Sequence, residues 1–121
     1  MITVIIDRSS GDNSIRGIYV SGHSGYAESG SDIVCAGIST LCYTAANALE
    51  DICGYDNEEF LTVHESEDDD VNLRIAVPEH GSEQQRQNAQ VIMRTAELGM
   101  ISVASSVNDG QDRFVEIIHS R

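Results

Sequence analysis

The stretch that decides how this chain is organised is residues 22–39, which read GHSGYAESGSDIVCAGIS. An alternating, strand-like pattern stops where this stretch begins, and a long helical pattern starts inside it. Asp32, or Ser31 beside it, is a good helix N-cap and would place Cys35 in the first helical turn. His23 stands at the end of the preceding strand, on its more polar face. We therefore expect a strand, a loop and a helix that bring one imidazole and one thiol together.

The loop between these two elements carries two glycines, Gly25 and Gly30, among small polar residues. Glycine has no side chain to restrict the backbone, so such a loop changes its conformation easily. We expect a mobile loop at about residues 24–31 that closes over a bound substrate and excludes water.

The predicted position of Cys35 suits a nucleophile. Unsatisfied backbone N–H groups and the positive end of the helix dipole favour an anion there, and the thiolate is the reactive form of cysteine. The same N–H groups would receive the oxyanion of a tetrahedral intermediate. His23 is the obvious general base, because the chain contains no lysine. The commonest role of a cysteine is that of a small buried residue, and the pattern alone leaves both interpretations of Cys35 open.

Charge limits the partners of this protein. The 121-residue chain is 40% hydrophobic, which is enough for one compact domain, residues 1–121, with a sizeable core. Seven basic residues oppose 20 acidic ones and give a net charge of −13. Such a chain repels nucleic-acid phosphates and attracts basic peptides or proteins, so we expect no direct binding to nucleic acid. The densest acidic run, residues 65–70, is interpreted mainly as a solvated turn.

Cysteine usage and hydropathy point to the cytoplasm. Cys35, Cys42 and Cys53 would lie on one helix, about 10 and 16 Å apart along its axis, whereas a disulfide needs Cα atoms within roughly 7 Å. Three unpaired thiols fit a reducing compartment. Met1 leads directly into an alternating apolar run, so no leader peptide is expected. The segment from Ile33 to Leu49 is too polar and too short for a membrane span and is predicted to be a buried helix, so we expect no membrane partner.

The order of the elements predicts the fold class. Alternating apolar residues indicate strands, apolar residues at helical spacing indicate helices, and turn residues separate them. The expected strands are residues 2–7, 15–23, 59–64, 71–77 and 114–119, and the expected helices are residues 32–53 and 82–103. The second helix begins with a capping box formed by Ser82 and Gln85. The order ββαββαβ argues for a single α+β domain, a mostly antiparallel sheet with two helices packed on one face.

The remaining histidines give no clear metal site. His23 and Cys35 combined with His64 or His80 have no zinc-finger spacing, so we expect no metal and no other cofactor. His64, His80 and His119 are expected at the surface or at strand ends. The chain also lacks a Cys-x-x-Cys pair, which argues against thiol–disulfide exchange.

Two motifs carry a family resemblance. The segments Gly22 to Ala27 and Gly30 to Ser39, which read GHSGYA and GSDIVCAGIS, resemble the two-part signature of the ribosomal-processing cysteine proteases, the Prp family. Length, acidity and the order of strands and helices are similar over nearly the whole chain. The resemblance implies a cysteine endopeptidase in which His23 and Cys35 form the catalytic dyad.

The resemblance also implies a substrate and an assembly. Family members remove a short N-terminal extension from large-subunit ribosomal protein twenty-seven, a basic protein, and cut after a pair of aromatic residues. They form homodimers, and the loop that here contains Gly25 and Gly30 becomes ordered when the peptide binds. Asp32 and Ser39 match further positions of the signature as supporting residues, Asp32 as a helix cap and Ser39 packed or bonded near the site.

Two other classes of function remain open. A non-catalytic acidic adaptor that docks on a basic ribosomal protein needs the same charge but no reactive thiol. A hydrolase of small thioesters or amides needs the thiol but no site for a peptide. Alkylation separates the adaptor from an enzyme, because a reactive Cys35 labels faster than Cys42 or Cys53.

Overall fold

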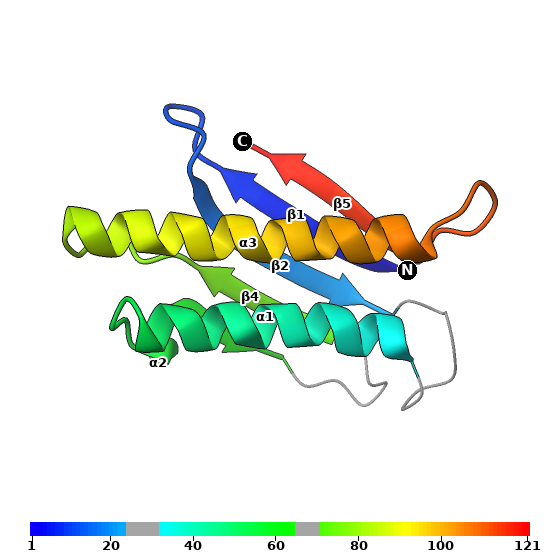
Figure 1. The fold of residues 1–121 in the computed structure, drawn as a ribbon, viewed down its shortest axis with the longest axis horizontal. Helices are drawn as coiled ribbons and strands as arrows, with labels where there is room; N and C mark the ends of the chain where they lie inside the picture. The colour runs from blue at the N-terminus through cyan, green and yellow to red at the C-terminus, as the bar shows by residue number, and fades with distance from the viewer. Residues whose placement is uncertain (24–31, 65–70) are drawn as a thin grey trace.

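The computed structural model describes residues 1–23, 32–64 and 71–121 and contains one sheet with two long helices on one face (Figure 1). The strands are β1 (Ile2–Arg8), β2 (Ile15–Gly22), β3 (Leu61–Val63), β4 (Val71–Ala76) and β5 (Val115–Ser120), and the helices are α1 (Ile33–Asp51), α2 (Asn57–Phe60) and α3 (Glu83–Val107). The predicted loop with Gly25 and Gly30 and the acidic run 65–70 lie outside the described residues.

The sheet has five strands in the order β3-β4-β2-β1-β5. β1 pairs with β2, β2 with β4 and β3 with β4 in antiparallel fashion, whereas β1 and β5 run parallel. The predicted α+β class with a mostly antiparallel sheet is therefore confirmed. The parallel pair arises because α3 carries the chain from β4 across one face of the sheet to its far edge, as a crossover helix does.

The core lies between this face of the sheet and the two long helices. The register pairs Val4 with Val20 and Val20 with Leu73, so the apolar positions of the central strands share one face. Buried residues of the strands are Ile2, Val4, Ile6, Ile15, Ile18, Val20, Leu73, Ile75 and Val115. The helices complete the core with Val34, Ile38, Cys42, Ala45, Ala46 and Leu49 of α1 and Ala89, Met93, Ala96 and Met100 of α3. Burial of this apolar surface is the main stabilising term of the fold.

The start of the third predicted strand is wrong. A strand was expected from Glu59, but the chain forms the single helical turn α2 there, and β3 begins two residues later. The side chain of Asp56 caps this turn by accepting a hydrogen bond from the Glu58 amide at 3.0 Å. Acidic residues in a first helical turn also favour the helix. The turn positions Phe60, which is 1% exposed, in the core.

Helix α1 is long and apolar enough to cross a membrane by length and composition alone, a test that a buried core helix also passes. Its apolar side packs on the sheet and on α3, in agreement with the predicted buried helix. The two helices are in close contact at Gly99, where an added Cβ would lie 2.6 Å from Leu41 Cδ2. Nearer to the start of α1, Val103 Cγ2 lies 3.9 Å from a Cβ built on Gly37. The first half of α1 is therefore held against the second half of α3.

The beginning of α3 agrees with the sequence. The Gln85 amide donates to Ser82 Oγ at 3.1 Å, and the Ser82 amide donates to Gln85 Oε1 at 2.8 Å. This reciprocal pair is the predicted capping box and fixes where the longest helix starts.

Candidate active site

Cys35 is the third residue of α1, as the cap at Asp32 predicted. Asp32 has an extended backbone (φ −79°, ψ 99°), and its Oδ1 accepts hydrogen bonds from the Val34 amide at 2.9 Å and the Cys35 amide at 3.1 Å. The Asp32 side chain is buried, with 7% of the residue exposed, while Cys35 is half-buried. The cap thus fixes the first turn of α1 and holds the Cys35 thiol there, partly exposed to solvent.

His23 follows the last residue of β2 and is placed by an unusual glycine. Gly22 has φ +105°, a left-handed conformation that other residues adopt only with strain. A Cβ at this position would lie 2.4 Å from the carbonyl oxygen of Met1. The register pairs Gly22 with Ile2, so the backbone at the start of β1 leaves no room for a side chain. Gly22 therefore sets the direction in which the chain presents His23.

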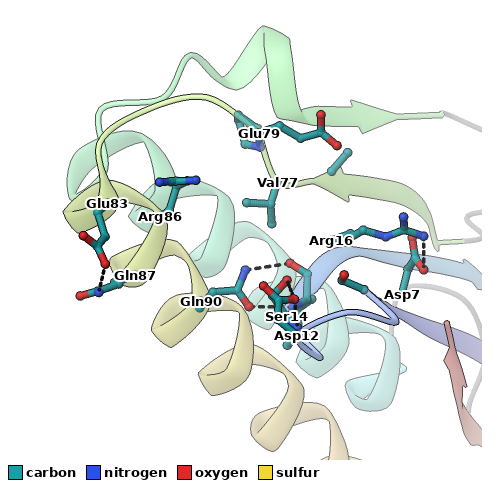
Figure 2. Close-up of a pocket in the computed structure, with 14 residues that line it drawn as sticks. Asp7, Asp12, Ser14, Arg16, Val77, Glu79, Glu83, Arg86, Gln87 and Gln90 are labelled. Carbon is teal, nitrogen blue, oxygen red and sulfur yellow. Dashed lines mark hydrogen bonds and ion pairs between the residues drawn. The ribbon is translucent and has the colours of Figure 1, made fainter.

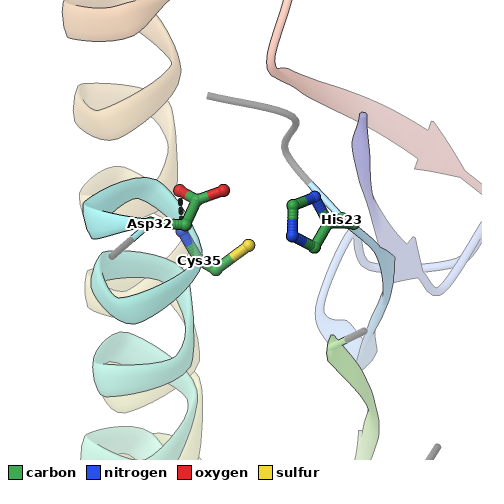
Figure 3. A group of neighbouring side chains, drawn as sticks. All are labelled: His23, Asp32 and Cys35. Atoms are coloured by element: carbon green, nitrogen blue, oxygen red, sulfur yellow. Dashed lines mark hydrogen bonds between the residues drawn. The ribbon is translucent and has the colours of Figure 1, made fainter. Parts of the chain in front are cut away.

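The two elements bring His23, Asp32 and Cys35 together (Figure 3). One nitrogen of His23, one carboxylate oxygen of Asp32 and Cys35 Sγ all lie within 4.8 Å of one another. The Cys35 thiol points toward the imidazole, and the carboxylate lies beside it at the helix start. These three residues, called the site cluster below, are the strand-end imidazole and helix-start thiol that the sequence predicted, together with the predicted cap.

The expected oxyanion site at the helix start needs correction. The sequence predicts unsatisfied amides around Cys35, but the Val34 and Cys35 amides donate to the Asp32 side chain and the Ala36 amide donates to the Asp32 carbonyl oxygen at 3.2 Å. A good N-cap satisfies the donors that it was chosen to satisfy. An oxyanion near Cys35 would have to share these amides with the cap or use other donors.

The other thiols are unsuitable for chemistry. Cys42 is 1% exposed, and burial raises the pKa of its thiol to about 12. Cys53 is 3% exposed, and burial also raises the pKa of its thiol. All three cysteines are free, as predicted from their spacing. Cys35 is the most accessible of the three.

The supporting serine and the other histidines considered in the sequence have no described contact with the Cys35 thiol. Ser39 lies one turn after Cys35 in α1 and is half-buried, so its supporting role stays a prediction. His64 and His119 are exposed, and exposed His80 lies 2.5 Å from Glu59, as expected for surface and strand-end histidines. The positioning role of Gly22 is not predicted from the sequence. The signal that could have indicated it is a glycine directly between a predicted strand and a candidate catalytic histidine.

A pocket of about 780 Å³ lies away from the site cluster (Figure 2). It lies between the β1–β2 turn, the segment after β4 and the start of α3, with Arg16, Glu79 and Arg86 among its lining residues. The β1–β2 turn and His23 are at opposite ends of β2, so this pocket cannot hold a group that reacts with Cys35. Within this lining, Gln90 of α3 is joined to Ile15 of β2 by two hydrogen bonds: its Oε1 accepts from the Ile15 amide at 2.7 Å and its Nε2 donates to the Ile15 carbonyl oxygen at 2.9 Å.

A family model described as "Cysteine protease Prp" matches residues 1–110 of this chain. The chain belongs to the Prp family of cysteine proteases. The ribosomal processing cysteine protease Prp of Bacillus subtilis (strain 168) is 33% identical over 93 residues, which cover 77% of this chain and 78% of the relative. The protein is accordingly a cysteine protease, a hydrolase, of the ribosomal-processing type.

Solved structures have the same Prp fold. The ribosomal processing protease Prp from S. aureus, in complex with a covalently linked product peptide, matches with a TM-score of 0.77 at 20% identity and covers 99% of this chain and 100% of its own. A protein from Streptococcus mutans matches with a TM-score of 0.73 at 25% identity and covers 99% of this chain and 94% of its own. The similarity therefore extends over the sheet and both long helices.

Proposed function

We propose that this protein is a cysteine endopeptidase that removes a short N-terminal extension from large-subunit ribosomal protein twenty-seven during ribosome maturation. Cys35 is the nucleophile and His23 its acid–base partner. The observation that supports this dyad is the approach of a His23 nitrogen and Cys35 Sγ to within 4.8 Å, at the start of a capped helix. The choice of substrate rests on membership in the ribosomal-processing family.

The reaction has two halves. His23 accepts the thiol proton while the sulfur of Cys35 attacks the scissile carbonyl carbon, which gives a tetrahedral oxyanion. The intermediate collapses to a thioester, the carbon–nitrogen bond breaks, and the imidazolium passes its proton to the departing amine. A water molecule, deprotonated by His23, then attacks the thioester, releases the extension as a carboxylic acid and restores the thiol.

Asp32 and Ser39 are supporting residues in this mechanism. Asp32 fixes the first turn of α1 through two amide hydrogen bonds, and its carboxylate lies within 4.8 Å of a His23 nitrogen, where it can steady the imidazolium. Ser39 lies one helical turn beyond the nucleophile. Both are positioning residues, because the Cys35 thiol and the His23 imidazole are the only protein side chains that form or break bonds in the proposed reaction.

Charge suits a basic substrate. Twenty acidic residues oppose seven basic ones, a net charge of −13, which raises the rate of encounter with a basic ribosomal protein at low ionic strength. The substrate loop, with Gly25 and Gly30, closes over the bound peptide and shields the reacting groups from bulk water. We expect the rate of cleavage at low substrate concentration to fall as salt is added.

We further propose the setting in which the enzyme works. It is a cytoplasmic homodimer without a catalytic metal or other cofactor, and it binds neither nucleic acid nor membranes. Three free cysteines are compatible with a reducing compartment. The acidic balance disfavours contact with nucleic-acid phosphates.

The decisive test is cleavage of a synthetic peptide that carries the extension and an aromatic pair before the cut. We expect cleavage by the wild type and none by Cys35→Ala. Cys42→Ala is the matched control, because it removes a thiol seven residues later on the same helix, and it should keep cleavage of the same order. Cleavage by Cys35→Ala at the wild-type rate would refute the nucleophile.

Alkylation and substrate range separate the alternatives. A reactive Cys35 should be labelled by iodoacetamide at least about tenfold faster than the two buried thiols. Equal and slow labelling of all three, with retained binding of the basic protein, would favour the acidic adaptor. Turnover of small thioesters or amides without peptide cleavage would favour a hydrolase of small acyl compounds.

A further inference from the structure

The site cluster contains three different metal ligands. Zn²⁺ binds thiolate sulfur, imidazole nitrogen and carboxylate oxygen, and sites with three protein ligands keep a fourth position for water. His23, Asp32 and Cys35 supply one donor of each kind. This set is soft enough for zinc and offers too few oxygens for Mg²⁺ or Ca²⁺. The chemistry of the donors therefore selects one class of ion.

The distances allow the three donors to share one ion. Bonds of about 2.0–2.3 Å in a tetrahedron place neighbouring donors roughly 3.3–3.6 Å apart. The donor atoms of the site cluster lie within 4.8 Å of one another, so each has to move by about an ångström or less. The Cys35 thiol already points toward the imidazole, and both side chains are only half-buried, so the contraction requires a small movement of side chains rather than of the helix.

The carboxylate is the fixed part of the set. Asp32 Oδ1 accepts from two helix amides, the Val34 amide at 2.9 Å and the Cys35 amide at 3.1 Å, which holds the side chain in place. Hydrogen bonds to a ligating carboxylate orient it and increase metal affinity. The buried carboxylate, 7% exposed, also contributes a full negative charge close to the ion. The half-buried thiol and imidazole give the ion access from solvent.

We propose that the site cluster binds one Zn²⁺ through His23, Asp32 and Cys35, and that the ion is a reversible inhibitor rather than a cofactor. Binding forms three metal–ligand bonds, releases the thiol proton to solvent and changes no oxidation state. The bound ion occupies the sulfur and the nitrogen that would carry out the reaction, so cleavage stops until the ion is removed. The inhibition rests on the proposed function; the binding does not.

Weaker zinc ligands elsewhere provide the control. His80 lies 2.5 Å from Glu59 on the exposed surface, a histidine–carboxylate pair without a thiol. If zinc bound only adventitiously, it would bind at such a pair as readily as at the site cluster. His80→Gln removes that pair and leaves the three proposed ligands unchanged.

Cobalt is the probe, because Co²⁺ occupies zinc sites and reports its ligands by absorption. Titration of the full chain with Co²⁺ under reducing, oxygen-free conditions should give a thiolate-to-cobalt band in the near ultraviolet and tetrahedral bands in the visible, saturating at one ion per chain. Added Zn²⁺ should remove both. Cys35→Ser should lose the near-ultraviolet band, and Asp32→Asn, which retains a helix cap, should weaken binding by at least about tenfold. His80→Gln should titrate like the wild type.

Two results would overturn the site. One is the absence of a thiolate band in the wild type, and the other is a thiolate band that persists in a folded Cys35→Ser or Cys35→Ala variant. Peptide cleavage distinguishes the two proposals. If cobalt binds through Cys35 and no peptide is cut, the proposed function fails and the metal site stands. If the peptide is cut and stoichiometric Zn²⁺ neither slows the reaction nor displaces Co²⁺, the zinc proposal fails and the protease stands.

Discussion

Two clusters in the described part of the chain combine a histidine with a buried carboxylate, and their surroundings differ. In the site cluster, the Asp32 carboxylate is held by two backbone amides of α1, with an imidazole and a thiol beside it. Those amides are fixed dipoles at the positive end of a helix, so they stabilise the anion without adding a cation. The side chains of His23 and Cys35 remain partly open to solvent.

The second cluster lies where α3 packs against the strands and is called the arginine cluster. Glu97 of α3 is fully buried and bonds to Arg8 of β1 and to Arg94 of its own helix. The second oxygen of Glu97, Oε2, has no hydrogen bond to any described residue and lies 3.6 Å from His119 Nδ1. His119 Nδ1 also lies 3.0 Å from Arg8 Nη1. Here the carboxylate is neutralised by guanidinium groups.

The comparison shows that a histidine beside a buried carboxylate can belong either to a structural cluster or to a candidate active site. Arg8 and Arg94 form ion pairs with the Glu97 carboxylate, and Arg8 also lies within hydrogen-bond distance of the His119 ring. Because the Arg8–Glu97 pair joins β1 to α3, the arginine cluster is structural. In the site cluster, backbone amides rather than arginines bind the Asp32 carboxylate, and the neighbouring imidazole and thiol are the proposed catalytic pair. The comparison predicts that the arginine cluster affects stability most, whereas changes in the site cluster affect activity more than stability.

The largest expected effect on stability is that of Glu97→Ala. The change leaves Arg8, whose side chain is only 11% exposed, without its buried partner, and we expect a loss of about 3–5 kcal/mol in the free energy of unfolding. Urea denaturation measures it. Asp7→Ala is the matched control, because it breaks the more exposed pair with Arg16 at 3.1 Å and should cost about 1 kcal/mol or less. Equal losses in the two variants would contradict a structural arginine cluster.

Gly22→Ala should combine loss of stability with loss of activity. The new Cβ would clash with the Met1 carbonyl at 2.4 Å and require φ +105°, and we expect a cost of at least about 2 kcal/mol. Cleavage should fall further than stability explains, by about 100-fold in kcat, since a small shift of the backbone moves His23. Gly54→Ala is the control: its φ is +77° but no atom lies within 4 Å of the added Cβ. Similar kcat values for both variants would show that Gly22 does not position the histidine.

The arginine cluster also predicts a pH dependence of stability. Burial raises the pKa of Glu97, but hydrogen bonds from Arg8 and Arg94 lower it, and the result lies below the ordinary value of 4.5. The folded protein then binds this proton less readily than the unfolded chain. The stabilisation is therefore present above about pH 4.5 and is lost as the pH falls through the folded pKa.

Glu97→Gln removes that titration. We expect the difference in unfolding free energy between wild type and Glu97→Gln to be constant from about pH 7 to pH 5 and to shrink below about pH 4.5. Because His119 faces the same carboxylate, the comparison is repeated in a His119→Gln background, where the same trend should appear. A difference that stays constant down to about pH 3 would mean that Glu97 is not preferentially ionised in the fold.

The features that the sequence predicted are mostly local. The cap at Asp32 and the capping box at Ser82 are set by side chains a few residues from the amides they satisfy, so their sequence signals are sufficient. Local signals also predicted His23 at the end of a strand and Cys35 in the first turn of a helix. The family resemblance, rather than the pattern, predicted that the two form a dyad.

The features that the sequence did not predict depend on competition between local signals or on contacts between residues far apart in the sequence. A strand is predicted from about Glu59, but Asp56 caps a helical turn over residues 57–60, and the strand therefore begins only at Leu61. The Arg8–Glu97 ion pair joins residues 89 apart, and nothing in the sequence specifies that pairing. The clash that requires glycine at position 22 comes from the backbone of Met1, across the β1–β2 pair. Such constraints become visible only when the strands are in register.

The smallest expected effect on stability, and the sharpest on mechanism, is that of Asp32→Asn. Asparagine is as good an N-cap as aspartate, so the free energy of unfolding should change by less than about 0.5 kcal/mol, whereas Asp32→Ala should cost about 1 kcal/mol. If the carboxylate also steadies the imidazolium, Asp32→Asn should lower kcat about tenfold, leave KM nearly unchanged and shift the pH profile of kcat. Full activity in Asp32→Asn combined with reduced activity in Asp32→Ala would reduce Asp32 to a helix cap. In that case, the carboxylate would have no part in orienting the imidazole.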